Sequence, residues 1–342
     1  MHSRQDFREI APTVTRRQAV LAGAGGLLLA AQRQSSRLSA AGYIWQQYAS
    51  RQKKPLADVL DEIFAMARNA GFKNVELSEA FFSPTLRDRV LKLARSNGLS
   101  MPSVYVGGAM HDAALANETI SRALEVGGLC KDLGCSAVVN NPNPKTQGAQ
   151  KSDEELAIQA ESLNRMGRAL SEKGLQFRVH HHSPEMAANA REWRHILKNT
   201  DPKYVSLCPD LDWMYQGGMD PLMLLREAGT RVTEIHVRNS KNKLWIEAFG
   251  EGDLDYQKIA ATLKKLRLSP LIVVELAYRD NTAVARSLEE DLRLSLSVAA
   301  KKGTSLAVER EPGVGLRSGL RWAQKEGKKL TASSLRPGCP RL

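Results

Sequence analysis

Short apolar runs alternate with longer amphipathic stretches along most of the chain, from Gly42 to about Lys301. Apolar residues that recur every three or four positions predict helices, and the short apolar runs predict strands. The predicted strands are 42–46, 73–77, 100–105, 136–140, 175–181, 204–208, 231–237 and 271–275. The predicted helices are 55–70, 84–97, 112–134, 152–173, 187–199, 219–228, 255–267 and 282–301.

Strands that alternate with helices in this way predict parallel pairing with right-handed crossovers. Eight strand–helix units in about 260 residues fit a closed barrel better than an open sheet. Gly71, Gly98, Gly134 and Gly174 each stand just before a predicted strand, where a helix commonly ends in a left-handed cap. We therefore predict an α/β fold, a single-domain (β/α)8 TIM barrel over residues 41–302.

The two ends of the chain differ from this body. Arg16 and Arg17 precede an apolar run that ends at Ala31, and this pattern resembles a twin-arginine export signal. The run is too short to span a bilayer. We expect residues 1–40 to be that signal and the protein to be periplasmic or otherwise exported, with an uncleaved cytoplasmic arm as the alternative. Residues 303–342 are predicted to be a poorly ordered basic tail, or to contain a helix around 317–329.

The charge distribution argues against a nucleic-acid-binding body. The chain of 342 residues has a formal charge of +12, with 42% hydrophobic and 25% charged residues, as is ordinary for a soluble globular protein. Residues 1–38 carry +4 and residues 301–342 carry +7, which leaves +1 for residues 39–300. A surface that follows phosphates needs more positive charge than that.

Polar residues of the predicted strands can be placed by their alternation. Successive side chains point to opposite faces of a strand, so the apolar set faces the helices and the polar set faces the lumen. In such a barrel the active site surrounds the carboxyl ends of the strands. The residues placed towards the lumen are Asn74, Glu76, Arg178, His180, His182, Ser206, Cys208, Asp210, Glu234, His236 and Glu275.

Five of these strands direct an ionisable residue to the same mouth. One such residue buried without a partner is costly, whereas several together can be satisfied by a cation. A single inward histidine is more often structural, and His180–His182 can alternatively be read as a surface tract. The convergence of imidazoles with carboxylates nevertheless predicts one divalent metal ion, Mn, Zn, Co, Fe or Mg, in preference to Ca.

At these residues the sequence resembles the xylose isomerase-like barrel superfamily of sugar isomerases and epimerases, over about residues 42–300. The second strand of that family ends in a glutamate, and its sixth strand has an aspartate followed by tryptophan and then Gly-Gly-x-Asp-Pro. The segments that carry the resemblance are Gly71–Glu76, Val179–Glu185, Asp210–Trp213 with Gly217–Pro221, Ile235–Asn239, Gly250–Asp255 and Val273–Glu275.

The resemblance implies roles for particular residues. It selects Asp210 over Asp212 as a ligand and leaves the choice between His180 and His182 open. The metal ligands we favour are His180, Asp210, His236 and Glu275, and Glu275 is also the favoured base. Glu76 and His182 are candidates for the second proton transfer or for sugar hydroxyls, and Trp45, Asn140, Trp213 and Arg238 for substrate contacts, with core packing as the alternative for the tryptophans.

Two departures from the family pattern affect the expected reaction. Many isomerases and epimerases carry a fifth-strand glutamate that relays a proton, and here the matching residue is His180 or His182. Arg238 and Asn239 replace the usual Lys-Asp. The first change puts a relay between two glutamates in doubt, whereas the fold and the metal do not depend on it.

The resemblance implies a metal-dependent sugar isomerase or epimerase that acts through an enediolate. The alternatives are a lyase or hydrolase of a keto-glycoside, an inosose-type dehydratase, and a non-catalytic sugar-binding protein. Abasic-site endonucleases share the barrel, but the nearly neutral body argues against them. We expect a small-molecule sugar substrate, no nucleic acid, no membrane span and a possible homo-oligomer.

Overall fold

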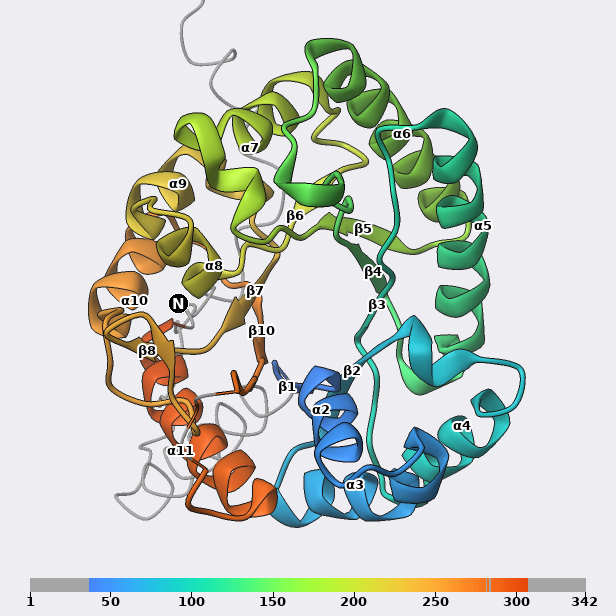
Figure 1. Cartoon of the computed structure of the whole chain (residues 1–342), viewed down its shortest axis with the longest axis vertical. Coiled ribbons are helices and arrows are strands. Elements are labelled where there is room, and N and C mark those ends of the chain that lie inside the picture. Colours follow the sequence, from blue (N-terminus) through green and yellow to red (C-terminus); the bar gives the residue numbers. More distant parts are fainter. Residues whose placement is uncertain (1–36, 281, 283, 307–342) are drawn as a thin grey trace, which may run out of the picture. The chain divides into compact units, whose positions relative to one another are not determined.

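Eight parallel strands form a ring inside a layer of helices (Figure 1). The computed structural model describes residues 37–280, 282 and 284–306 of the chain. The strand order is β6-β5-β4-β3-β2-β1-β10-β7, and single bridges from Leu207 to Val232 and from Asp210 to His236 connect β6 to β7. The ring is thus nearly closed, which confirms the predicted (β/α)8 barrel. Residues 1–36 of the predicted export signal and residues 307–342 of the predicted tail lie outside the described residues.

The barrel strands are short and mostly buried, and a small hairpin lies beside them. The barrel strands are β1 (Leu38–Ala41), β2 (Asn74–Ser78), β3 (Ser103–Tyr105), β4 (Ala137–Asn140), β5 (Gln176–Val179), β6 (Ser206–Leu207), β7 (Glu234–Val237) and β10 (Leu271–Val274). The hairpin strands are β8 (Ser240–Lys241) and β9 (Leu244–Trp245), which pair antiparallel.

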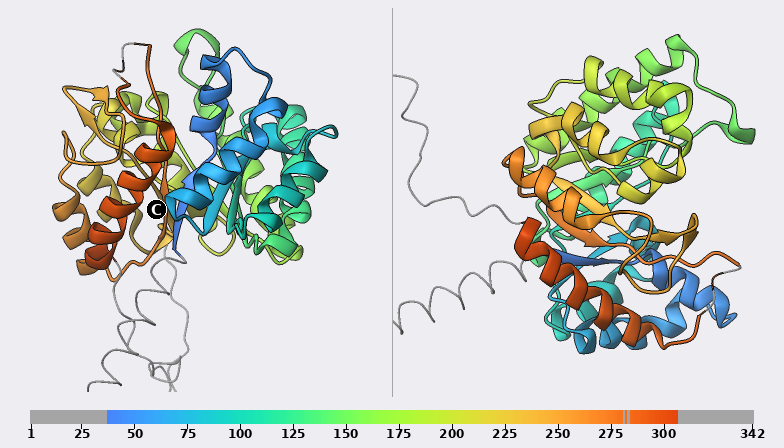
Figure 2. Two further views of the ribbon diagram at one scale, coloured as in Figure 1. Left: turned by 90° about the horizontal axis from the view of Figure 1, so that it is seen from below. Right: turned by 90° about the vertical axis from the view of Figure 1, so that its left-hand side faces the viewer.

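Helices follow the strands, and most of them form a layer outside the ring, which Figure 2 shows from two further sides. They are α2 (Tyr43–Arg51), α3 (Leu56–Ala70), α4 (Arg87–Ser96), α5 (Ala113–Leu129), α6 (Asp153–Glu172), α7 (Ala187–Asn199), α8 (Leu211–Gln216), α9 (Pro221–Ala228), α10 (Tyr256–Lys265) and α11 (Leu288–Leu306). The last helix, α11, contacts both α3 and α10, so the chain's final described element completes the outer layer. No helix among the described residues combines the length and the apolar content that a membrane crossing requires.

The first strand was predicted in the wrong place. It occupies Leu38–Ala41, and the predicted segment 42–46 instead begins helix α2, after the Gly42 N–H donates to the Glu76 carbonyl oxygen at 2.7 Å. The strand sequence Leu-Ser-Ala-Ala contains only one large apolar residue, whereas the following Tyr-Ile-Trp contains three large residues that are typical of strands. As a result, the barrel begins at Leu38, three residues before the predicted domain boundary.

Four further differences concern short elements and helix ends. The predicted helix 112–134 ends at Leu129, and the predicted helix 282–301 begins only at Leu288. Helix α8 and the hairpin β8–β9 were not predicted. Six residues of helix and two-residue strands are too short for a periodic pattern to identify them.

The lumen below the mouth is polar, in agreement with the alternation argument. The Ser103 hydroxyl lies 2.8 Å from Glu76 Oε2 and 2.9 Å from Glu234 Oε1. Arg178 forms an ion pair with Glu234 and donates to Gln176 Oε1 at 2.9 Å. Buried charges of this kind are tolerated only when their partners are in place. The inward placement of Glu76, Arg178 and Glu234 is therefore confirmed.

Helix α6 approaches the segment before β6 so closely that only glycine fits at one position. A Cβ atom at Gly167 would lie 2.5 Å from the Tyr204 carbonyl oxygen. We predict that Gly167→Ala destabilises the protein by about 1–3 kcal/mol, the usual cost of overpacking, even though alanine favours a helix. The control is Gly128→Ala in α5, where an added Cβ meets nothing within 4 Å. Equal thermal unfolding temperatures for the two variants would contradict the prediction.

Candidate metal centre and pocket

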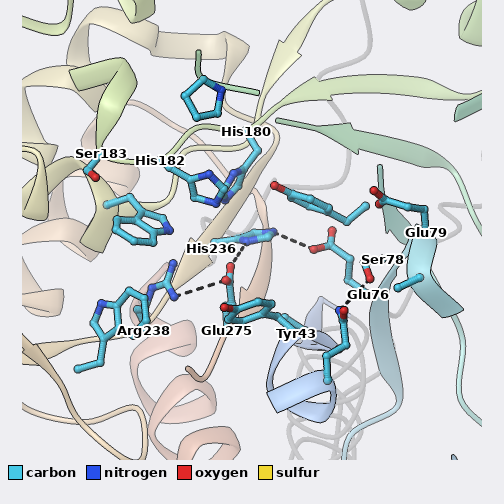
Figure 3. Close-up of a pocket in the computed structure, with 18 of the residues that line it drawn as sticks. Tyr43, Glu76, Ser78, Glu79, His180, His182, Ser183, His236, Arg238 and Glu275 are labelled. Carbon is cyan, nitrogen blue, oxygen red and sulfur yellow. Dashed lines mark hydrogen bonds and ion pairs between the residues drawn. The ribbon is translucent and has the colours of Figure 1, made fainter. Parts of the chain in front are cut away.

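A cavity of about 580 Å³ opens at the carboxyl ends of the barrel strands (Figure 3). Because these ends converge, residues far apart in sequence contribute to one wall. The lining residues that were predicted from sequence are Glu76, His180, His182, Trp213, His236, Arg238 and Glu275. Those that were not predicted include Tyr43, Gln46, Ser78, Glu79, Tyr105, Ser183 and Trp245.

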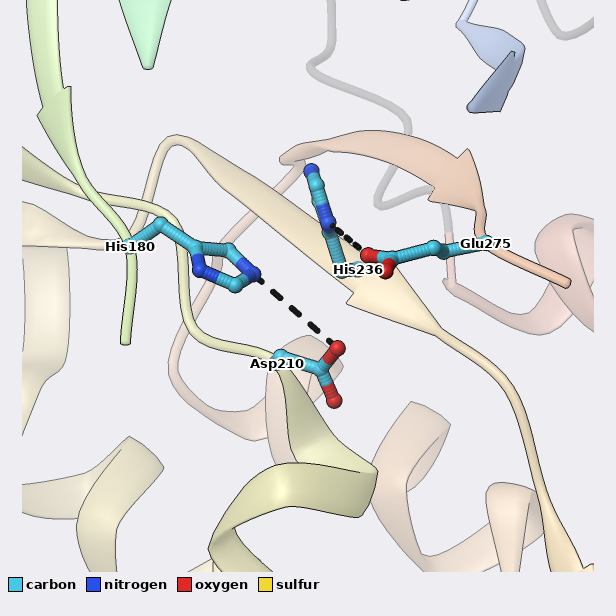
Figure 4. Close-up of side chains that lie close together, drawn as sticks. All are labelled: His180, Asp210, His236 and Glu275. Carbon is cyan, nitrogen blue, oxygen red and sulfur yellow. Dashed lines mark hydrogen bonds and ion pairs between the residues drawn. The ribbon is translucent and has the colours of Figure 1, made fainter. Parts of the chain in front are cut away.

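Four buried side chains from four strand ends lie close enough together to hold one metal ion (Figure 4). They are His180, Asp210, His236 and Glu275, and one ligand atom from each lies within 4.8 Å of the others. Ligand atoms that lie about 2.1 Å from one tetrahedral ion are about 3.4 Å apart, so the four side chains would draw slightly closer together around an ion. Two nitrogens and two carboxylate oxygens are a donor set that suits transition metals.

His180 provides the strongest evidence that the group fits an ion. Its side chain is 1% exposed, and neither ring nitrogen has a hydrogen-bond partner. Leaving buried polar atoms unsatisfied costs free energy, which a metal bond would offset. Burial also holds the pKa of His180 well below its usual value, so the imidazole is in the neutral form that binds metals.

His236 lies between two carboxylates. Its Nδ1 is 2.6 Å from Glu275 Oε2, and its Nε2 is 2.9 Å from Glu76 Oε1, although this second contact lacks hydrogen-bond alignment. Burial favours the neutral imidazole, but the neighbouring carboxylates of Glu76 and Glu275 outweigh this effect and raise the pKa of His236 well above its usual value. A metal at this ring therefore has to displace a proton.

Asp210 is held from several directions. Its Oδ1 accepts from the Trp213 N–H at 2.9 Å and thereby caps α8, and its Oδ2 accepts from Arg238 at 2.6 Å. Its own backbone N–H donates to Nε2 of His181 at 3.3 Å. Burial raises the pKa of Asp210 to about 6, even though Arg238 lowers it. The carboxylate is thus oriented before any ion binds.

Asp212 binds the hairpin β8–β9 through both of its carboxylate oxygens. Its two oxygens accept hydrogen bonds from the Ser240 hydroxyl at 2.7 Å and from the Trp245 indole N–H at 2.8 Å. Both donors belong to the hairpin β8–β9. Asp212 therefore anchors that hairpin against α8, and it is not part of the four-residue group.

Arg238 places one positive charge beside the carboxylates at the mouth of the site. Its guanidinium lies 5.0 Å from the Trp213 ring centre and 4.6 Å from that of Trp245. It bonds Asp210 and approaches Glu275 Oε1 at 3.4 Å. Burial raises the pKa of Glu275, but Arg238 and His236 outweigh this effect and bring it to about 2. Glu275 is consequently ionised at neutral pH.

The three consecutive histidines occupy three different environments. His180 belongs to the four-residue group. The ring of His181 packs edge-on against Trp193 at 5.0 Å, and burial lowers its pKa to about 3, so it can accept the Asp210 N–H. His182 lines the pocket beside Trp213 at 5.2 Å, and burial lowers its pKa to about 4. His182 lies outside the four-residue group.

A second set of possible ligands among the described residues comprises Cys208, Glu234 and His236. Both sets contain His236, so an ion bound by one set would prevent an ion from binding to the other set through the same ring nitrogen. Burial raises the pKa of the Cys208 thiol, which disfavours the thiolate that a metal requires. We therefore regard the four-residue group as the better site.

Two residues predicted to contact substrate lie elsewhere. Trp45 is fully buried within α2, with ring centres 5.7 Å from Phe64 and 6.2 Å from Phe81, so it belongs to the core. This follows from the misplaced first strand. Asn140 is also buried, donates to the Val106 carbonyl at 2.7 Å and does not line the cavity.

A family model described as xylose isomerase-like TIM barrel matches residues 64–302. Among curated proteins, the inosose dehydratase of Bacillus velezensis is 28% identical over 156 residues, 40% of this chain and 52% of that protein. The inosose dehydratase of Salmonella typhimurium is 29% identical over 148 residues, 38% of this chain and 49% of that protein. The chain thus spans about half the length of these curated relatives.

Solved structures share the fold at low sequence identity. A sugar phosphate isomerase/epimerase from Parabacteroides distasonis has a TM-score of 0.60 at 17% identity, covering 77% of this chain and 93% of that one. D-allulose 3-epimerase from Methylomonas sp. has 0.61 at 15%, covering 78% and 97%. 3-Keto-D-glucoside 4-epimerase from E. coli has 0.57 at 16%, covering 76% and 97%. At these identities the likeness concerns the fold alone.

The short 3-10 helix Pro184–Met186 contains a buried carboxyl group, and its ionisation should affect the stability of the fold. Glu185 is 1% exposed, its Oε2 accepts from the His182 N–H at 3.0 Å, and its Oε1 has no partner. Burial, and to a lesser extent Glu192, raises the pKa of Glu185 to about 7. The folded state therefore holds this proton more tightly than the unfolded state does.

We predict that the stability from Glu185 is fully present below the ordinary glutamate pKa and is lost as the pH rises through about 7. Glu185→Gln keeps the acceptor for His182 without a charge. Between pH 5 and pH 8 the wild type should lose on the order of 2–3 kcal/mol of unfolding free energy that the Glu185→Gln variant does not lose. Chemical denaturation at both pH values measures this, with Glu161→Gln on the exposed side of α6 as control. An identical pH dependence in wild type and Glu185→Gln would refute it.

Proposed function

Because the chain belongs to the xylose isomerase-like TIM barrel family, we propose that it is a metal-dependent enzyme that removes a proton beside the carbonyl of a sugar or sugar-derived ketone. The observation that carries the proposal is His180, a buried imidazole with both nitrogens unsatisfied, within ligand distance of Asp210, His236 and Glu275. The group lies at a cavity large enough for a sugar.

In this proposal His180, Asp210, His236 and Glu275 hold one divalent ion, which supplies a Lewis acid for the negative charge that develops on the substrate oxygens. Arg238 keeps Glu275 ionised, so Glu275 is the proposed proton acceptor. His182, neutral at the cavity wall, is the proposed second proton carrier.

Glu76 fits a positioning role better than a proton-transfer role. One of its oxygens contacts His236 and the other accepts from Ser103, so both are engaged within the lumen. A carboxylate behind a metal-binding histidine fixes the orientation of its ring. We therefore propose that Glu76 orients His236.

The deprotonated substrate has two possible fates. Return of the proton to another face or carbon gives epimerisation or isomerisation, and loss of a neighbouring hydroxyl gives dehydration. Dehydration is the second candidate, favoured by the inosose dehydratases among the curated relatives and by His180 in place of a fifth-strand glutamate. In both cases the first bond to break is the same C–H bond.

The metal itself is directly testable. We predict that the purified full chain contains about one equivalent of a divalent transition metal and that His236→Ala loses it, because the ring is one of only four ligands. Elemental analysis after desalting measures the content. His195→Ala on α7, a histidine outside the ligand group, is the control. Full metal retention in His236→Ala would remove the central claim.

The reaction can be followed by NMR in D₂O with keto-sugars and an inosose. We expect metal-dependent incorporation of deuterium, lowered about 10²–10⁴-fold by Glu275→Gln, the usual contribution of a general base. Exchange without loss of a group identifies an isomerase or epimerase, and loss of water identifies a dehydratase. Binding without any exchange would instead indicate a sugar-binding protein and overturn the enzymatic proposal.

A further inference from the structure

Two neighbouring strands direct polar side chains into the cavity that the proposed metal centre does not use. Ser78 at the end of β2 is in register with Tyr105 at the end of β3. Two residues earlier on the same strands, the Ser103 hydroxyl donates to Glu76 inside the lumen. Because side chains alternate along a strand, Ser78 and Tyr105 point to the same side as that pair, one step closer to the mouth. Both residues line the cavity.

The hydroxyl groups of these two residues have hydrogens to give. The Ser78 oxygen accepts from Gln46 Nε2 at 2.9 Å, and its own hydrogen has no acceptor among the described residues. The Tyr105 hydroxyl has no hydrogen-bond partner in that part of the chain. A phenol keeps its hydrogen at neutral pH and so remains a donor. Two neighbouring donors therefore face the cavity without a protein acceptor.

Glu79, the residue after Ser78, adds an acceptor to this group. Its two oxygens share one backbone donor, the Gly107 N–H, at 3.2 Å each. A carboxylate has about four acceptor positions, so most of them are available on a side chain that lines the cavity. In Figure 3, Glu79 and Ser78 lie on the side of His236 away from His182. Donors beside an acceptor match a polyol, because each of its hydroxyl groups both gives and accepts a hydrogen bond.

These residues belong to strands across the barrel from two of the proposed metal ligands. In the strand order, β2 is four positions from β6, which precedes Asp210, and β3 is four positions from β7, which carries His236. Four positions are half the circumference of an eight-stranded ring. The centre of the Tyr105 ring is nevertheless only 5.4 Å from that of His180. One small ligand can therefore reach both sides of the cavity.

We propose that Tyr105, Ser78 and Glu79 form a hydroxyl-binding subsite, which holds hydroxyl groups on substrate carbon atoms that the metal does not hold. That the ligand is a polyol rests on the proposed function. The subsite itself rests on the register of β2 and β3 and on donors without acceptors. A substrate held from both sides has one orientation, which decides the C–H bond that meets Glu275. The three subsite residues thus determine specificity and carry no proton.

The test starts from a panel of polyols with a carbonyl group, namely D-fructose, D-allulose, D-tagatose and an inosose. Each is titrated calorimetrically into the Mn²⁺-saturated full chain, and the tightest binder is used for the variants. Tyr105→Phe keeps the ring beside His180 but removes the donor, so we expect it to weaken binding about three- to tenfold. Tyr204→Phe, outside the cavity lining, is the matched control. Equal metal content in the three proteins excludes an indirect effect through His180.

Analogues of that ligand that each lack one hydroxyl group distinguish a direct contact from a structural effect. One of them should bind wild type and Tyr105→Phe within about twofold of each other, because the bond to Tyr105 is already absent. Ser78→Ala should give the same kind of result, and it decides alone if Tyr105→Phe fails to fold. Equal weakening for every analogue, unchanged binding in the folded variants, or no binding of any polyol in the panel overturns the subsite.

The proposed function can fail separately. Selective weakening in Tyr105→Phe, together with a purified chain that holds no metal or catalyses no deuterium exchange, would refute the enzymatic proposal and leave the subsite standing. Metal-dependent exchange with unchanged binding in the variants would refute the subsite alone.

Discussion

The structure depends on balancing carboxylates that are buried inside the barrel. Glu76, Glu234, Asp210 and Glu275 are each 8% exposed or less, and isolated charges at such depth are prohibitively costly. Arg178 pairs with the lower Glu234, and Arg238 pairs with the upper Asp210 and Glu275. His236 contacts both levels through Glu76 and Glu275. The metal proposed at the upper level would add positive charge beside Asp210 and Glu275. The same ion would therefore balance the buried carboxylates and take part in the proposed reaction.

The short segment from Asp210 to Trp213 connects that balance to the shape of the pocket. Asp210 caps α8 with one oxygen, and this cap fixes the helix that carries Trp213. Asp212, two residues later, holds Trp245 through its indole N–H. A change at Asp210 therefore alters a proposed metal ligand and the position of Trp213 together. His181 supports the same segment from behind by accepting the Asp210 N–H.

The sequence predicted the structure correctly where the alternation of polar and apolar residues extended over enough positions to define a strand face. Alternation along the strands placed Glu76, Arg178 and Glu234 towards the lumen, because a two-residue period leaves only two faces to choose between. The first strand was misplaced because Leu38–Ala41 has one large apolar side chain. Tyr43 and Trp245 were not identified as pocket residues, since one begins an unpredicted helix and the other depends on a long-range bond to Asp212. Such tertiary contacts leave no local pattern.

The Ser103 hydroxyl has one hydrogen but lies within bonding distance of two carboxylates, Glu76 and Glu234. One of the two contacts therefore requires a further hydrogen on a carboxyl group. Burial raises the pKa of Glu234 to about 7, against the opposing effect of Arg178, so Glu234 is the natural carrier. The barrel thus stores an exchangeable hydrogen beneath its mouth. When that hydrogen leaves, one more negative charge lies beneath His236. This charge would favour the protonated form of His236 and so raise its pKa further.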